Sequence, residues 1–209
     1  IEGDGWTAKT LFTPGHTANH LAFALEGTDY TLSGDHVMAW ATTIVAPPDG
    51  SMADYMASLK MIQAEPQTIY FPGHGGRLEN ARDFVRVLRG HRRMREQAVF
   101  EQVQKGRETI PAIVAVIYRT TDPKLHGAAG LSVLAHLEDL VGKGKAICDG
   151  PPMLDSIYRA AGTPSSLGPE ERHPDQREMP QSARRWLRGH AGRNESLTAY
   201  PPAFPSLLR

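Results

Sequence analysis

The chain has 209 residues, of which 40% are hydrophobic and 22% are charged, and this composition is ordinary for one or two soluble globular domains. Lysine plus arginine and aspartate plus glutamate number 23 each, so the formal charge is zero, which argues against a dedicated nucleic-acid binder that must neutralise phosphates. Cys148 is the only cysteine, which excludes an intrachain disulfide partner and favours a cytoplasmic protein, and no apolar run approaches the roughly 20 residues that cross a membrane.

The first predicted elements, in chain order, are three short strands. Residues 9–12 form an apolar run that ends at the turn residues Thr13-Pro14-Gly15. Residues 21–25 and 30–33 flank a Gly27-Thr28-Asp29 turn, a pattern that predicts a β-hairpin.

A helix and a further strand follow. Ser51 is a suitable N-cap for a helix over residues 52–63, and residues 68–71 predict a strand that is stopped by Pro72-Gly73. The apolar residues of the helix recur three or four positions apart: Met52, Tyr55, Met56, Leu59 and Ile62. Strand, turn, helix and strand in this order predict an α+β fold in which helices cover a mixed sheet.

The next part of the chain predicts three helices and one strand. A long helix covers residues 78–104, a second runs from its cap Thr109 to about residue 118, and a third covers residues 127–141. Residues 145–149 then predict a short wing strand. Three helices followed by a β element are the outline of a winged helix, which is a variant of the helix-turn-helix.

Residues 159–209 differ in composition from the rest. Pro, Gly, Ser, Arg and Glu dominate there, with few apolar residues before LTAYPPAFPSLL near the end. Such a segment buries too little apolar surface to offset the entropy lost on ordering, so we expect a disordered tail.

Three segments of the chain share one design, a strand that runs into a glycine and then into a side chain able to bind a metal. They are LFTPGH, ending at His16, LSGD, ending at Asp35, and YFPGH, ending at His74. The glycine permits a tight turn, and the strand end holds the side chain on a rigid scaffold. One such turn alone is more often an ordinary turn. Three of them in this order predict a site for Zn²⁺, which binds imidazole nitrogen and carboxylate oxygen.

The stretches TPGHTANHLAF, SGDHVMAW and FPGHGG resemble the third, fourth and fifth sequence motifs of the metallo-β-lactamase superfamily. The later stretch, from HRRMRE through TIPAIVAVIY to HLEDLVGKGKAICDG, is similar to the winged-helix appendage of one branch. That branch comprises β-lactamase-like hydrolases related to glyoxalase II and includes a mitochondrial endoribonuclease. The resemblance implies the C-terminal half of a four-layer αββα domain over residues 1–90 and a small winged-helix domain over residues 91–158.

Carried over residue by residue, the resemblance implies that His16 and His74 each bind one of two Zn²⁺ ions, and that Asp35 bridges both. It implies hydrolysis by a metal-bound hydroxide, which Asp35 helps to orient as the catalytic residue. Ester, thioester, lactam-like and RNA phosphodiester substrates are all compatible with this chemistry. The expected partner is thus a small-molecule ester or thioester, or an RNA, and the winged helix favours RNA.

One part of the superfamily pattern is missing from this sequence. The His-x-His-x-Asp-His motif, to which the resemblance assigns the other ligands, occurs nowhere in the chain, and the spacing of His16 and His20 does not replace it. Since the chain also opens at Ile1 without a methionine, we expect a fragment whose preceding part carries that motif. With His16, Asp35 and His74 alone, the chain is expected to bind zinc weakly and to be inactive.

The helix over residues 78–104 supports an alternative function without catalysis. Arginines outnumber acids on it, which is typical of an electrostatic footprint for RNA or DNA, although a solvated helix face is the simpler interpretation. The chain would then be a nucleic-acid-binding winged-helix module on a degenerate, metal-free scaffold. The arginines are Arg82, Arg86, Arg89, Arg92, Arg93 and Arg95.

Other residues near the predicted ligands give weaker patterns. For His20, a role beside a ligand or in packing is favoured over direct metal binding. His36, next to Asp35, stays open between these roles. Trp40 and Thr42-Thr43 precede residues 46–50, a segment that either lines the pocket or is simply loop structure.

Overall fold

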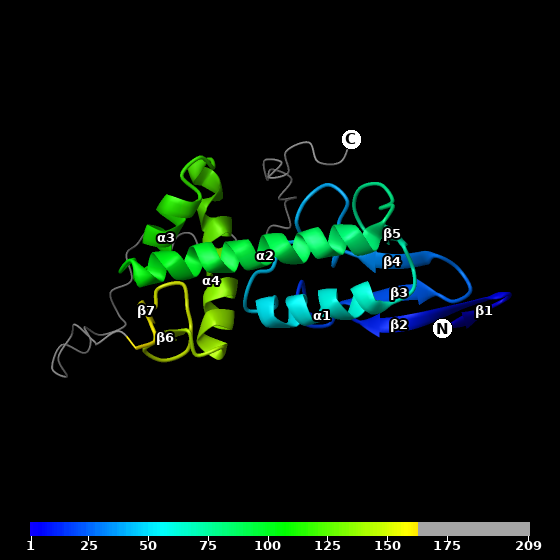
Figure 1. The fold of residues 1–209 in the computed structure, drawn as a ribbon, viewed down its shortest axis with the longest axis horizontal. Helices are drawn as coiled ribbons and strands as arrows, with labels where there is room; N and C mark the ends of the chain where they lie inside the picture. The colour runs from blue at the N-terminus through cyan, green and yellow to red at the C-terminus, as the bar shows by residue number, and fades with distance from the viewer. Residues whose placement is uncertain (163–209) are drawn as a thin grey trace. The chain divides into compact units, whose positions relative to one another are not determined.

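A five-stranded sheet forms the first half of the described chain (Figure 1). The computed structural model describes residues 1–162, so residues 163–209 of the predicted tail lie outside the described residues. The strands lie in the order β1 (Glu2–Gly3), β2 (Trp6–Phe12), β3 (Leu21–Leu25), β4 (Tyr30–Gly34) and β5 (Ile69–Pro72). Strands β2, β3 and β4 are antiparallel neighbours, and β5 runs parallel to β4. Consequently β2, β4 and β5 point the same way, and their C-terminal ends share one edge of the sheet.

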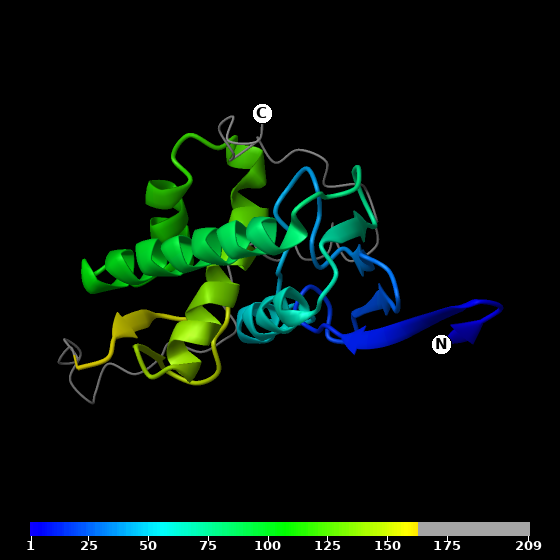
Figure 2. The ribbon, with the colours of Figure 1, turned by 45° about the vertical axis from the view of Figure 1, so that its right-hand side comes forward.

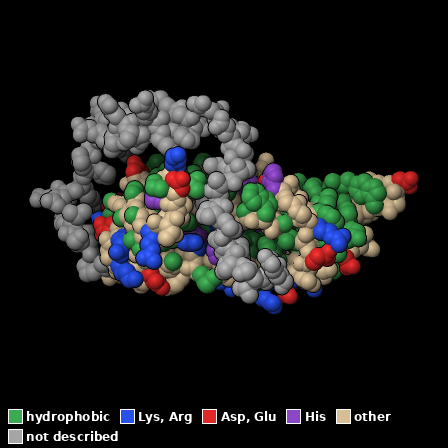
Figure 3. Space-filling model, turned by 90° about the horizontal axis from the view of Figure 1, so that it is seen from above, with side chains coloured by type: hydrophobic (Ala, Val, Ile, Leu, Met, Phe, Trp, Pro, Cys, Tyr) green, Lys and Arg blue, Asp and Glu red, His purple; other side chains and the backbone are tan. Residues whose placement is uncertain are grey.

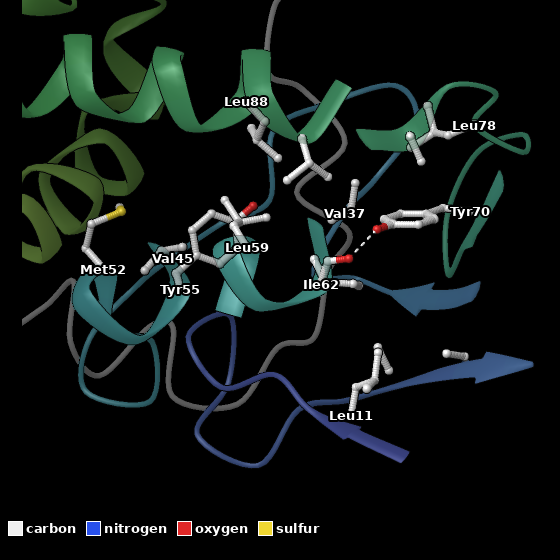
Figure 4. Close-up of a cluster of buried hydrophobic side chains, with 14 of the residues drawn as sticks. Leu11, Val37, Val45, Met52, Tyr55, Leu59, Ile62, Tyr70, Leu78 and Leu88 are labelled. Atoms are coloured by element: carbon white, nitrogen blue, oxygen red, sulfur yellow. Dashed lines mark hydrogen bonds between the residues drawn. The ribbon is translucent and has the colours of Figure 1, made fainter. Parts of the chain in front are cut away.

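Helix α1 (Met52–Ala64) supplies much of the first hydrophobic core (Figure 4). As predicted, Ser51 caps the helix, because its hydroxyl accepts a hydrogen bond from the backbone N–H of Asp54 at 3.3 Å. Tyr70 of β5 reaches the helix and donates its O–H to the carbonyl of Ile62 at 2.8 Å. The helical spacing predicts the buried face correctly, since four side chains are at most 1% exposed: Met52, Tyr55, Leu59 and Ile62.

Helix α2 (Ala81–Gln104) is shared by two hydrophobic cores. Leu88 in its first half belongs to the first core, and Val99 in its second half belongs to the second. The helix begins three residues later than predicted, because Leu78 exchanges two backbone hydrogen bonds with Tyr70, at 3.0 and 2.8 Å. Residues 1–161 form one compact unit, and the domain boundary predicted between residues 90 and 91 falls inside α2 and stays a prediction.

The second core is built from the end of α2 and the elements after it. Helix α3 (Ile110–Ile117) is capped by Thr109, as predicted, and the 3₁₀ turn η1 (Pro123–Leu125) precedes α4 (His126–Gly142). Strand β6 (Ala146–Cys148) pairs antiparallel with β7 (Tyr158–Ala160), a three-residue strand that was not predicted. Within residues 1–162, no helix combines the length and the hydropathy that a membrane crossing requires.

The outer face of the sheet carries large apolar side chains that stay exposed, and Figure 3 shows such side chains gathered over the strand end of the molecule. Phe12 pairs with Leu21, and Leu32 pairs with Phe71, so the register places them on one face. The ring of Tyr30 meets that of Phe71 edge-on, with 5.5 Å between the centroids. Exposure ranges from 37% for Phe71 to 60% for Phe12. A contiguous apolar face is typical of a contact surface.

Leu59→Ala should lower the free energy of unfolding by about 2–5 kcal/mol, because Leu59 is fully buried and its truncation leaves a cavity in the first core. Met94→Ala is the control, since Met94 lies on α2 with 66% of its surface exposed and should change the stability by less than about 0.5 kcal/mol. Urea denaturation followed by circular dichroism measures both. Equal losses would contradict the assignment of the buried face of α1.

Candidate metal centre

The three predicted ligands lie at one edge of the sheet. His16 follows β2, Asp35 follows β4 directly, and His74 lies two residues after β5. Because these strands point the same way, the loops that follow them meet. The structure therefore brings together all three side chains, although they are separated by up to 58 positions in the sequence.

The ring nitrogens of both histidines approach the same carboxylate oxygen. Nε2 of His16 lies 3.9 Å from Oδ2 of Asp35, and Nε2 of His74 lies 3.6 Å from that atom. Two atoms that each lie about 2.0–2.2 Å from one zinc ion are at most about 4.4 Å apart. Both separations fit a shared or bridged divalent cation.

The hydrogen bond of His16 fixes its tautomer. Nδ1 of His16 lies 2.7 Å from the carbonyl oxygen of Ile44, which only accepts, so Nδ1 carries the proton. In the neutral ring, Nε2 then presents a lone pair beside the carboxylate of Asp35. Two electron-rich atoms side by side are unfavourable without a cation, and an imidazole whose other nitrogen donates to a carbonyl is the usual metal-binding arrangement.

Asp35 is held through its backbone, while its carboxylate remains available. Its backbone N–H donates to Nε2 of His20 at 3.2 Å, and its carbonyl accepts from the hydroxyl of Thr43 at 2.7 Å. Oδ1 of Asp35 is buried and has no hydrogen-bond partner among the described residues. A buried carboxylate oxygen without a partner is costly unless a ligand satisfies it, and this fits a bridging metal ligand.

Two glycines allow the loops to approach one another. Gly15 has a φ of 129°, and a Cβ atom there would lie 2.3 Å from the Cα of Tyr55. A Cβ atom at Gly73 would lie 2.6 Å from Oδ1 of Asp35. The glycines before His16 and His74 are therefore required by close contact, as well as by the turns that the sequence predicts.

The neighbouring histidines have supporting positions. Nδ1 of His20 donates to the hydroxyl of Thr13 at 2.8 Å while its Nε2 accepts from Asp35, and burial, followed by the field of His16, lowers its pKa. His36 is fully buried, with its ring 4.7 Å from that of Tyr55, and burial lowers its pKa to about 3. Both rings are thus neutral near pH 7 and pack beside the predicted ligands.

His16, Asp35 and His74 are candidates for only part of a metal site. No group of three or more His, Cys, Asp or Glu residues within residues 1–162 has the arrangement of a metal-binding cluster. Any metal centre at this position would therefore need ligands from outside the described residues.

Trp40 lies beside the loop that carries His74. The indole is 51% exposed, and a Cβ atom at Gly75 would lie 2.8 Å from its Cδ1. The side chain of His74 is itself 64% exposed. An aromatic surface therefore flanks the candidate centre on its solvent side. The sequence pattern singled out Trp40 but not its contact with Gly75.

The arginines of α2 are mostly engaged with the protein. Arg82 donates to the carbonyl of Glu65, Arg89 to the side-chain oxygen of Gln63, and Arg92 to the carbonyl of Thr43. Arg86 pairs with Asp83, and Arg95 lies over the ring of Tyr118 at 4.8 Å. Of these six arginines, Arg93 is the one whose side chain makes no hydrogen bond, ion pair or ring contact with another described residue. Apart from Asp83, the partners are distant in the chain, so the sequence pattern could not reveal them.

The comparisons with known proteins agree with this geometry. A family model described as the metallo-beta-lactamase superfamily matches residues 1–74, and one described as the beta-lactamase associated winged helix domain matches residues 109–150. A metallo-beta-lactamase family protein from Thermus thermophilus gives a TM-score of 0.65 at 25% identity, over 77% of this chain and 51% of that chain.

Two curated relatives are similar in sequence. The chain is 35% identical over 147 residues to the Beta-lactamase-like protein 2 homolog of Drosophila melanogaster. The matched region covers 68% of this chain and 48% of that protein. It is 32% identical over 110 residues to the atrochrysone carboxyl ACP thioesterase of Aspergillus fumigatus, over 51% of this chain and 34% of that protein. The chain therefore spans about half or less of the length of these relatives.

Gly73→Ala should weaken the binding of Zn²⁺ to this chain by roughly tenfold or more, about 1.4 kcal/mol, because the new methyl group displaces the carboxylate of Asp35. Gly76→Ala is the matched control, since a Cβ atom there meets nothing within 4 Å. Amide chemical shifts of His16, Asp35 and His74 during a zinc titration give both dissociation constants. An unchanged zinc affinity in Gly73→Ala would show that the carboxylate of Asp35 does not bind the metal.

Proposed function

Since the chain joins a metallo-beta-lactamase superfamily region to a beta-lactamase associated winged helix domain, we propose that it is part of a metal-dependent hydrolase centred on His16, Asp35 and His74. The family and the α+β fold expected from the sequence are thereby confirmed. One observation carries the proposal: both imidazole Nε2 atoms approach the same oxygen, Asp35 Oδ2, at 3.9 and 3.6 Å.

Zinc is the proposed ion. Two imidazole nitrogens and a carboxylate suit Zn²⁺, and the proton on Nδ1 of His16 leaves Nε2 free to coordinate. When bound, such ions lower the pKa of coordinated water and polarise the oxygen of a substrate carbonyl. The residues of this chain would hold the ions in place. His16 and His74 lie on different loops, and Asp35, with its second oxygen unpartnered, would be the ligand that they share.

The proposal applies to a polypeptide in which further ligands complete the centre. The His-x-His-x-Asp-His pattern is absent from these residues, and the chain spans 48% of its Drosophila relative. We expect this chain by itself to bind zinc weakly and to lack hydrolase activity. Activity is therefore to be measured in the natural protein that contains the chain.

An acyl substrate fits the loops better than RNA does. Residues 13–20, 36–48 and 72–76, which surround the three ligands, contain no lysine or arginine, and Arg77 is paired with Glu79 at 2.8 Å. RNA binding relies on basic side chains that neutralise phosphates. We therefore propose a neutral ester or thioester at this centre, in place of the RNA that the winged helix favours, and the similarity to an ACP thioesterase supports it.

The nucleic-acid-binding alternative finds less support. Most arginines of α2 are engaged with protein groups, as described above. Helix α4 is the third helix of the winged helix, and its central residues 133–137 are all buried. A helix buried in this way cannot enter a major groove, where the recognition helix of this motif normally lies. We favour the hydrolase.

Asp35→Ala should lower kcat of the natural protein about 10³-fold or more, roughly 4 kcal/mol, because the bridge between the two histidines is lost. Asp54→Ala is the control, because Asp54 is exposed in the first turn of α1 and should leave turnover unchanged. Hydrolysis of a chromogenic thioester and elemental analysis of bound zinc measure the effect. Full turnover by Asp35→Ala would place the reactive centre elsewhere.

Trp40→Ala should raise KM for an aromatic acyl thioester about tenfold and leave KM for an acetyl thioester nearly unchanged, because only the larger group reaches the indole. Trp6→Ala is a matched control, since Trp6 is also 51% exposed but lies on β2, beside Gly3. Steady-state kinetics with both thioesters give the KM values, and an RNA oligonucleotide is tested as the competing substrate. Efficient RNA cleavage without thioester turnover would contradict the acyl assignment.

A further inference from the structure

Arg92 is a buried cation without an acidic partner. The residue is only 6% exposed, and the ion pairs among the described residues do not include it. Its Nη2 donates to the carbonyl of Thr43, and its guanidinium carbon lies 5.3 Å from the centre of the Tyr55 ring. Burying a charge in this way is costly, and an apolar side chain would pack at lower cost. Packing alone therefore does not explain an arginine here.

The two residues that Arg92 contacts hold the backbone of the predicted bridging ligand. The hydroxyl of Thr43 donates to the carbonyl oxygen of Asp35 at 2.7 Å and lies 3.1 Å from the carbonyl oxygen of His36. The hydroxyl of Tyr55 donates to the carbonyl of His36 at 2.9 Å. A short chain of contacts thus leads from Arg92 to the peptide groups of residues 35 and 36.

On its other side, Asp35 is held by His20. The backbone N–H of Asp35 donates to Nε2 of His20, so both polar groups of its backbone are bonded to side chains. The carboxylate, by contrast, has an oxygen without a partner. The position of the carboxylate is consequently set by the backbone anchors, and among residues 1–162 Arg92 is the cation that contacts Thr43 and Tyr55.

We propose that Arg92 is a positioning residue which, through Thr43 and Tyr55, keeps the carboxylate of Asp35 between His16 and His74. The inference rests on the proposed function, because it concerns the same metal centre. Since Arg92 lies on α2, which continues into the second core at Val99, the contact also links the winged-helix region to the centre. Residues that orient metal ligands in this way typically change metal affinity about 10–100-fold when they are removed.

The test compares four variants of the natural protein. Arg92→Met removes the hydrogen-bond donor and the charge. Thr43→Val removes the hydroxyl while the shape of the side chain is retained. Thr43→Ser restores the hydroxyl and is the rescue variant. Arg93→Met is the matched control on the same helix, because Arg93 is exposed and its side chain makes no hydrogen bond or ion pair with another described residue. Zinc dissociation constants are measured by competition with a chromophoric chelator, on protein shown to be folded by circular dichroism.

We expect Arg92→Met and Thr43→Val to raise the zinc dissociation constant about 10–100-fold, with Thr43→Ser and Arg93→Met close to the parent protein. A purely structural role would lower the unfolding midpoint but leave the dissociation constant of the folded protein unchanged, and that result would overturn the inference. If Arg92→Met does not fold, the test is the comparison of the zinc dissociation constants of Thr43→Val and Thr43→Ser.

The failure of this inference is distinguishable from the failure of the proposed function. If Asp35→Ala loses zinc while Thr43→Val and Arg92→Met bind it normally, the metal centre stands and the positioning role is wrong. If Asp35→Ala itself retains zinc and activity, the metal centre is wrong, and the inference falls with it.

Discussion

The carboxylate of Asp35 lies between two imidazoles that come from loops far apart in the sequence, and this placement depends on how the strands and α1 pack in the first core. Strands β2, β4 and β5 point the same way, so the loops after them meet at one edge. Glycine at position 73 leaves room for the carboxylate, and glycine at position 15 leaves room for α1. A larger side chain at position 73 would displace the carboxylate of Asp35, and one at position 15 would clash with the backbone of Tyr55 in α1.

Two helices, α2 and α4, connect the second core to the first (Figure 2): Ala135 of α4 lies in the first core, although most buried residues of α4 belong to the second. Helix α2 contributes Leu88 to the first core and Val99 to the second, and Arg92 lies between them. The winged-helix elements pack around the end of that helix, with the middle of α4 buried. In this arrangement the winged-helix elements are packed against the first core, and residues 133–137 in the middle of their third helix are buried. The zero net charge of the chain agrees with that arrangement.

Local patterns predicted the elements well where the signal is short-range. The cap at Ser51 and the apolar spacing of α1 depend on residues a few positions apart, and both agree with the structure. The start of α2 was predicted too early, because Leu78 bonds to Tyr70 of β5, a partner that helical periodicity does not register. Strand β7 was missed because three residues carry too little alternation, and its pairing with β6 is decided by tertiary contact.

The sequence identifies His16, Asp35 and His74 as candidate ligands of a divalent metal, because each follows a strand and a glycine. Their separations, the proton on Nδ1 of His16 and most partners of the α2 arginines follow from the tertiary structure alone. The difference has a physical reason. Turns and helices are specified by neighbours in the chain, whereas the contact of Arg92 with Thr43 joins residues 49 positions apart and depends on how α2 packs.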